Sequence, residues 1–145
     1  MPRQLTESER QEFLAAKHVA VLSVATTDGR PPASIPIWYQ YTPPGGGDIQ
    51  ISTGPSTRKA RLIAEAGAAT LVVQDEDPPY RYVVVEGTLV DTTDPTPPEV
   101  LEKTAVRYLG EEGGRQFVQS MAGHANVLFT IRPDRWLTAD FSDEL

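Results

Sequence analysis

The stretch HVAVLSVATTDGRPPASIPIWYQY, residues 18–41, decides the fold. Its first part is rich in β-branched residues, which favour extended strands. Asp28-Gly29 is typical of a β-hairpin turn, and a second extended run follows at residues 33–41. Proline lacks the amide hydrogen that a sheet ladder needs. We therefore expect the second strand, which Pro31, Pro32 and Pro36 interrupt, to lie at a sheet edge or to carry a bulge.

The rest of the chain predicts more strands and a few short helices. Extended segments are expected at residues 48–53, 68–74 and 80–90, and a closing hairpin over residues 126–140 that turns at Pro133-Asp134. Thr6 and Glu9 fit a capping box for a helix over residues 5–17. Ser56 can cap a helix over residues 57–66 that ends at Gly67, and two helices, 99–109 and 115–121, are expected on either side of Gly110. The run PPGGG, residues 43–47, predicts a loop.

These elements indicate the fold class. Six or seven strands, mostly joined by tight turns and with helices inserted rather than alternating, predict an antiparallel barrel of the α+β type. The absence of a Gly-x-Gly-x-x-Gly motif argues against a Rossmann cofactor site. At 145 residues we expect one domain, residues 1–145.

Composition removes several classes of function. The chain has no cysteine, and its two histidines, His18 and His124, lie in no metal-ligand spacing, so we expect no metal site. A net charge of -7 argues against nucleic acid as the main partner. No apolar run approaches the ~20 residues that a membrane span needs, and the first residues show no signal-peptide core. A cytoplasmic protein without a membrane partner is therefore expected.

The run STGPSTRKAR, residues 52–61, is the strongest candidate for a binding site. It places Ser52 and Thr53 at the end of a strand, and Thr57, Arg58, Lys59 and Arg61 at the start of a helix. Amide donors and the helix dipole favour an anion there, whereas cations in a first helical turn oppose the dipole. A bound phosphate would resolve that conflict. The alternative is a solvated basic face that only aids solubility.

The run Ile35-Pro36-Ile37-Trp38-Tyr39 is the second candidate. Backbone amides at a proline bulge on an edge strand can meet the polar rim of a flat heterocycle while aliphatic groups cover its plane. The alternative is that Trp38 is ordinary core. We find no serine–histidine–acid triad in the sequence, so a cofactor should carry the difficult step if the protein is an enzyme.

Taken in order, these motifs resemble the pyridoxamine 5′-phosphate oxidase-like superfamily of flavin and deazaflavin oxidoreductases, the split β-barrel flavoproteins. The matching pieces are the N-terminal helix, the Val-Ala-Val-Leu-Ser-Val strand, Asp28-Gly29-Arg30-Pro31, the Pro-x-Trp strand, Ser-Thr-Arg-Lys-Ala, the Tyr-Arg-Tyr-Val-x-Val-Glu-Gly strand and the closing Pro-Asp-Arg-Trp hairpin. The resemblance implies a six-stranded split barrel that forms a homodimer with two cofactor sites at the interface.

The resemblance also implies roles for individual residues. Arg58 and Lys59 look like ligands of the cofactor phosphate, supported by Ser52, Thr53 and Thr57. Pro36, Ile37 and Trp38 look like the strand beside the tricyclic ring, and Tyr82 lies where the family contacts that ring from a neighbouring strand. Segments 43–47, 75–80 and 110–124 are expected to shape the pocket of the electron acceptor.

The uncharged strand from Ile35 to Tyr39 looks more like the branch that uses the deazaflavin coenzyme F420 than like true pyridoxamine phosphate oxidases, whose corresponding strand is rich in arginine and lysine. This implies an oxidoreductase that transfers hydride between the deazaflavin and a small conjugated organic acceptor. Arg61 would help to hold the phosphate or the acidic tail. Two alternatives remain: an FMN-dependent oxidase or reductase, and a non-catalytic protein that binds flavin, deazaflavin or a tetrapyrrole.

Overall fold

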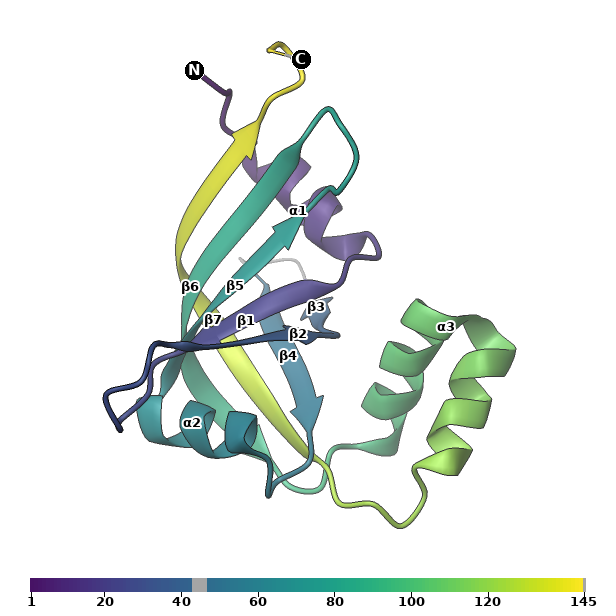
Figure 1. Cartoon of the computed structure of the whole chain (residues 1–145). Coiled ribbons are helices and arrows are strands. Elements are labelled where there is room, and N and C mark those ends of the chain that lie inside the picture. Colours follow the sequence, from purple (N-terminus) through teal and green to yellow (C-terminus); the bar gives the residue numbers. More distant parts are fainter. Residues whose placement is uncertain (43–46, 145) are drawn as a thin grey trace.

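The computed structural model describes residues 1–42 and 47–144, and this part of the chain forms one antiparallel sheet with three helices (Figure 1). Its seven strands are β1 (Ala20–Val24), β2 (Ala33–Ile37), β3 (Gln40–Thr42), β4 (Asp48–Thr53), β5 (Ala68–Gln74), β6 (Arg81–Thr93) and β7 (Val127–Asp140). Their order in the sheet is β2-β1-β5-β6-β7-β4-β3. The α+β class is confirmed, while the strand count is seven among the described residues rather than the six that the resemblance implied. The predicted loop at residues 43–47 lies, except for Gly47, outside the described residues.

The predicted hairpin at Asp28-Gly29 is confirmed, because β1 and β2 pair across it with Leu22 opposite Ile35. The proline-rich β2 is an edge strand, as expected. The extended run 33–41 is nevertheless two strands. β2 follows β1 only as far as Ile37, after which the chain turns away and pairs with β4 through Gln40 opposite Gln50. This change of partner at Trp38-Tyr39 creates the seventh strand.

The predicted closing hairpin is wrong, because residues 127–140 form the single strand β7, which pairs along nearly its whole length with β6. Gly87 pairs with Pro133 and Glu86 with Arg135, so Asp134 is an extra residue in a β-bulge rather than part of a turn. A side chain at Gly87 would place its Cβ 2.7 Å from the Arg132 carbonyl oxygen. Glycine therefore lets the two strands approach closely where the sheet bends.

Two of the helices are short and begin at side-chain caps. The capping box is confirmed for α1 (Glu7–Ala15): the Glu9 amide donates to the Thr6 hydroxyl and the Thr6 amide to the Glu9 carboxylate. The helix α2 (Arg58–Ala66) is capped by Thr57, whose hydroxyl accepts from the Ala60 amide, and not by Ser56 as predicted. Gly67, with φ 65°, ends α2 as expected.

The segment α3 (Pro98–Ser120) is a helix with a break inside it. Gly110 has φ 83° and ψ 171°, so it separates a first arm, residues 98–109, from a second arm, residues 111–120. Figure 1 shows the two arms folded against each other beside the sheet. The prediction of two helices on either side of Gly110 is confirmed, although the second begins earlier than expected.

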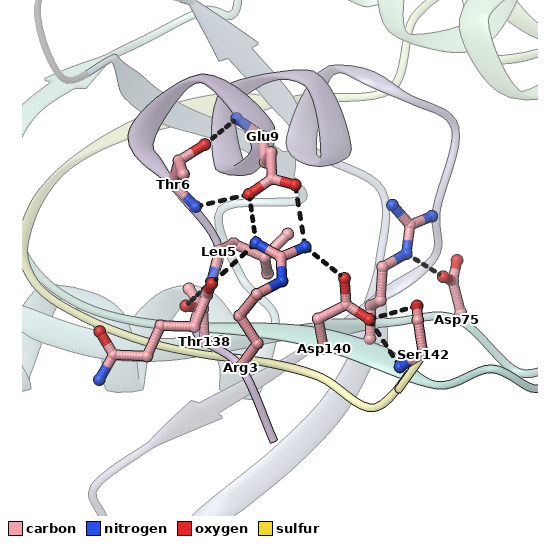
Figure 2. A network of polar contacts seen from close by, with 10 residues as sticks. Arg3, Leu5, Thr6, Glu9, Asp75, Thr138, Asp140 and Ser142 are labelled. Atoms are coloured by element: carbon pink, nitrogen blue, oxygen red, sulfur yellow. Dashed lines mark hydrogen bonds and ion pairs between the residues drawn. The ribbon is translucent and has the colours of Figure 1, made fainter. Parts of the chain in front are cut away.

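The core lies between the inner face of the sheet and the helices α1 and α2, which sit at opposite ends of it (Figure 1). Phe13 and Leu14 from α1 and Leu62 and Ile63 from α2 are buried there. Figure 2 shows how the start of the chain is tied to the end of β7: the Arg3 guanidinium donates to both Glu9 and Asp140, at 2.8 Å each. No helix in the described part of the chain is long and apolar enough to cross a bilayer.

Candidate functional site

A cleft of about 810 Å³ lies where the ends of β2 and β4, the start of α2 and both arms of α3 meet. Its lining includes residues 36–38 from β2 and the segment after it, and residues 52–54 from the end of β4. The α3 side supplies residues from both arms and from the following segment, up to Asn126. No described lining residue is an aspartate or glutamate, in a chain that has 20 of them. Lys59 is the cation in this lining, so the cleft favours an anionic group at one point.

The polar end of the cleft is built from hydroxyl groups and the start of α2. The Thr57 hydroxyl donates to the Gly54 carbonyl at 2.9 Å and lies 3.4 Å from the Thr53 hydroxyl. The Ser52 hydroxyl lies 2.9 Å from the hydroxyl of the buried Thr96. These contacts fix the turn from β4 into α2. The amide groups of Arg58 and Lys59 have no acceptor among the described residues, which is the arrangement that binds anions at helix starts.

Lys59 is the charged group of this end. Its side chain is half-buried, and burial lowers the pKa of its ammonium group below the usual value. In residues 1–42 and 47–144 no carboxylate lies within ion-pair distance of it. A half-buried and unpaired cation is costly unless a ligand anion meets it.

Aromatic side chains form another part of the cleft wall. The Trp38 ring stacks on Tyr108 with centroids 4.9 Å apart and planes 5° apart, and the Phe117 ring lies 5.4 Å from Trp38 at 54°. Trp38 is half-buried at the cleft wall and not part of the core. Its alternative assignment as ordinary core is therefore wrong.

Tyr108 joins the first arm of α3 to the point where β2 ends. Its hydroxyl accepts from the Tyr39 amide at 3.2 Å and donates to the His18 carbonyl at 2.7 Å. Burial raises the pKa of this hydroxyl, so it stays protonated. Arg107 adds two bonds to carbonyls near the end of α1, at 3.0 Å to Leu14 and 2.8 Å to Ala16.

The structure brings six of the ten predicted site residues into the cleft lining: Pro36, Ile37, Trp38, Ser52, Thr53 and Lys59. Thr57 acts as the helix cap beside them. Arg58 and Arg61 lie on α2 outside the lining, and Arg61 is exposed. Tyr82 lies elsewhere, near the start of β6, opposite Gln74 and Ala139 and with its ring 6.3 Å from Phe141.

The wall supplied by α3 was anticipated only as the segment 110–124. The sequence does not single out most of the residues that form it, which include Leu101, Thr104, Ala105, Phe117, Val118, Met121 and Asn126. Their spacing on a helix is the same whether the apolar face meets the core or a ligand, so periodicity could not assign them.

A second hollow, of about 430 Å³, has the opposite character. It is lined by Asp75, Glu76, Asp77 and Asp140, with Arg81 as its cation. Arg81 is already paired with Asp75 at 2.8 Å (Figure 2 labels Asp75 beside the network). An anionic coenzyme would be repelled here, so the cleft beside Lys59 is the better candidate.

Solved structures support the fold. The chain is similar to an F420 reductase, with 22% identity and a TM-score of 0.69 over 88% of this chain and 94% of that one. It is also similar to a conserved hypothetical protein from Mycobacterium tuberculosis, with 22% identity and a TM-score of 0.72 over 94% of this chain and 85% of that one. A haem storage protein from Vibrio cholerae matches with 13% identity and a TM-score of 0.61 over 92% and 94% of the two chains.

The comparison with curated proteins gives no significant match. The sequence does match the family described as pyridoxamine 5′-phosphate oxidase, over residues 6–140, which is nearly the whole chain. The seven-stranded sheet and the three helices agree with that match. The chain belongs to the pyridoxamine 5′-phosphate oxidase-like family of split-barrel flavin and deazaflavin proteins.

Proposed function

We propose that this protein is a coenzyme F420-dependent reductase that holds the deazaflavin in the cleft between α2 and α3. When bound, the coenzyme would supply hydride to a small conjugated organic acceptor. The observation that carries the proposal is the unpaired, half-buried Lys59 in a cleft that no described aspartate or glutamate lines and whose wall includes the stacked ring of Trp38. A coenzyme with a phosphate and a flat apolar ring would match Lys59 and residues 36–38, which leaves the Phe117 part of the wall for the second reactant.

The chain's own residues would bind and orient the two reactants. The phosphate would be held by the Lys59 ammonium and by the free amides at the start of α2, with Arg58 and Arg61 attracting it from outside the lining. Pro36, Ile37 and Trp38 would lie along the ring. Fixing two flat molecules in contact lowers the barrier through proximity and orientation, without a protein nucleophile.

The choice of F420 over FMN rests on the uncharged strand at residues 35–39 and on the likeness to the F420 reductase. Titration of the apoprotein with each coenzyme tests it, with Trp38 emission in a Trp136→Phe background as the signal. We expect F420 to bind at least ten-fold more tightly than FMN. Tighter binding of FMN would replace the proposal by the FMN-dependent alternative.

The basic cluster is tested by the double variant Arg58→Ala with Lys59→Ala. Each charge-assisted hydrogen bond to a phosphate contributes about 1.5–3 kcal/mol. Loss of the Lys59 contact alone should therefore weaken F420 binding by at least ten-fold. Lys103→Ala is the matched control, because it removes an exposed cation of α3 outside the cleft lining. Unchanged affinity in the double variant would refute the assignment.

Turnover measurements test whether the protein is an enzyme. Reduced F420 mixed with the protein and a panel of quinones and enones should pass its hydride to an acceptor and become oxidised, with a gain of absorbance at 420 nm that appears only when an acceptor is present. Binding of F420 without oxidation by any member of the panel would favour the non-catalytic alternative.

We also propose that two copies of the chain pair through the outer face of the sheet. Val21, Val72, Val84 and Leu137 lie in cross-strand register in one row over four strands. Val21 is 38% exposed and Leu137 48% exposed, which is unusual for large apolar side chains in a continuous row. Leu137→Asp should convert a dimer into a monomer in sedimentation velocity. Lys103→Ala, at an exposed site of α3, is the control, because it changes the net charge by the same one unit.

A further inference from the structure

The two arms of α3 are anchored very differently. The first arm is bonded to the barrel through Tyr108 and Arg107, and its Ala105 is 1% exposed. The second arm contacts the barrel through the ring of Phe117 against Trp38. It also meets the first arm, through an exposed ion pair of 3.6 Å between Arg115 and Glu102 and through close packing of Gly114 on Val106. The position of the second arm is therefore set mainly by how it packs on the first.

That packing depends on Gly114. A Cβ at this residue would lie 2.6 Å from the Val106 nitrogen and 2.7 Å from the Val106 Cα, which is closer than atoms can approach. The obstructing atoms are backbone, so they cannot rotate away as a side chain would. The two arms thus touch backbone to backbone, and any side chain at 114 must separate them. Gly113 is different, because its Cβ would lie 3.3 Å from the Leu109 Cβ, a contact that small adjustments relieve.

The second arm presents an uncharged surface to the cleft. Phe117 and Val118 line it, followed by Met121 in the next turn, and Phe117 is 38% exposed. The charged groups of this arm, such as Arg115, are not in the lining. A molecule held against Phe117 and Val118 therefore meets no charged side chain of this arm. Lys59, the cation in the lining, belongs to α2.

We propose that the second arm of α3 is the wall that selects the electron acceptor, that this acceptor is an uncharged apolar ring compound, and that Gly114 is the positioning residue of the wall. The inference rests on the proposed function only in naming the bound molecule as the electron acceptor. Its physical content, an apolar subsite whose width is set at Gly114, holds whether or not turnover occurs.

Binding of the neutral aromatic amine N-phenyl-1-naphthylamine to the apoprotein tests the subsite without the coenzyme. The variants are made in a Trp136→Phe background, which leaves Trp38 as the energy donor because the chain has 2 tryptophans. We expect Gly114→Ala to raise the dissociation constant of the amine at least five-fold, because the displaced arm takes Phe117 away from Trp38. Gly113→Ala should stay within two-fold and controls for the change in helix propensity.

Two further readouts separate selection from simple damage. The dissociation constant of F420 should change less than two-fold in Gly114→Ala, and with menadione as acceptor the KM should rise while kcat stays within two-fold. If Gly114→Ala does not fold, Phe117→Ala decides, and we expect it to weaken binding of the amine at least five-fold. Wild-type affinity for the amine in the folded variant, or an equal loss of F420 binding, overturns the inference. Failure of F420 to bind the wild type would instead refute the proposed function.

Discussion

Replacing Tyr108 by phenylalanine removes one hydroxyl and leaves two backbone groups without a partner. The Tyr39 amide lies 3.2 Å from that hydroxyl and belongs to a residue with no exposed surface. The His18 carbonyl, which receives the hydroxyl at 2.7 Å, is only partly buried. A buried polar group that loses its partner costs about 1–3 kcal/mol. With the full cost for the amide and part of it for the carbonyl, we expect a loss of about 2–4 kcal/mol in the free energy of unfolding.

Tyr39→Phe is the matched comparison. The Tyr39 hydroxyl donates to the Leu14 carbonyl at 2.7 Å, but that carbonyl also accepts from Arg107 at 3.0 Å. It therefore keeps a partner, and we expect a loss of about 1 kcal/mol, the net value of one hydrogen bond. Burial and packing of the two rings change little in either variant, so the difference between them isolates the unsatisfied groups.

Urea unfolding measures both values, at one fixed protein concentration because association would add to apparent stability. The slope of free energy against urea should not change, while the midpoint of Tyr108→Phe should fall further than that of Tyr39→Phe. Equal losses, or a loss below about 1 kcal/mol for Tyr108→Phe, would show that water replaces the hydroxyl. The stated role of Tyr108 in joining α3 to the sheet would then be refuted.

Two other predictions concern charge. Burial lowers the pKa of Lys59, so its charge opposes folding at pH 7. Lys59→Met should leave the free energy of unfolding unchanged or raise it by less than about 1 kcal/mol after solvent screening, with the difference from wild type vanishing as pH rises toward 10.5. Arg3 holds the pKa of Glu9 at about 2, below the ordinary 4.5. The ionised Glu9 therefore stabilises the fold above pH 4.5, and this stabilisation is lost as pH falls through about 2. The free energy of unfolding in urea should fall between pH 4.5 and about 2 in the wild type, and it should fall less in Arg3→Gln. An identical fall in both proteins would rule out a stabilising contact between Arg3 and Glu9.

Local patterns predicted the local structure well. The capping box at Thr6 and Glu9, the hairpin at Asp28-Gly29 and the helix end at Gly67 all depend on a few neighbouring residues, and all are confirmed. One local prediction failed, because Thr57 and not Ser56 caps α2, but the failures that change the topology involve partners that are distant in sequence. Pro133 and Asp134 have the composition of a turn, but their conformation is set by Gly87 on another strand, which makes Asp134 a bulge. A pattern within one segment contains no information about that partner.

In the candidate site, too, the residues of one local segment could be predicted and those brought together by the tertiary structure could not. Ser52, Thr53 and Lys59 belong to one strand-turn-helix segment, and the conflict between cations and the helix dipole could be recognised from the sequence alone. The same argument included Arg61, which the structure places on the exposed side of α2. A helix turns by about 100° per residue, so three basic residues within four positions cannot all face one cleft.

The aromatic wall required the tertiary structure. Trp38 and Phe117 are far apart in sequence and meet only because Gly110 folds the second arm of α3 back and Gly114 lets it lie close. In a sequence these glycines read as helix breakers, which ordinarily indicate a loop. Here they place the apolar surface of the second arm at the cleft, and this arm makes few contacts with the barrel.

The distribution of charge would let an acidic protein hold the anionic coenzyme that we propose. The net charge of -7 opposes any anion at long range, but this repulsion is screened within about 10 Å at 0.1 M salt. Four carboxylates, those of residues 75–77 and Asp140, line the acidic hollow, whereas no described aspartate or glutamate lines the cleft beside Lys59. An anion that reaches the cleft therefore meets one desolvated cation and free helix amides at short range, where screening is weakest. Lys59 can attract an anion into the cleft because no carboxylate of the described residues pairs with it, and the protein pays for this with a small loss of stability when the cleft is empty.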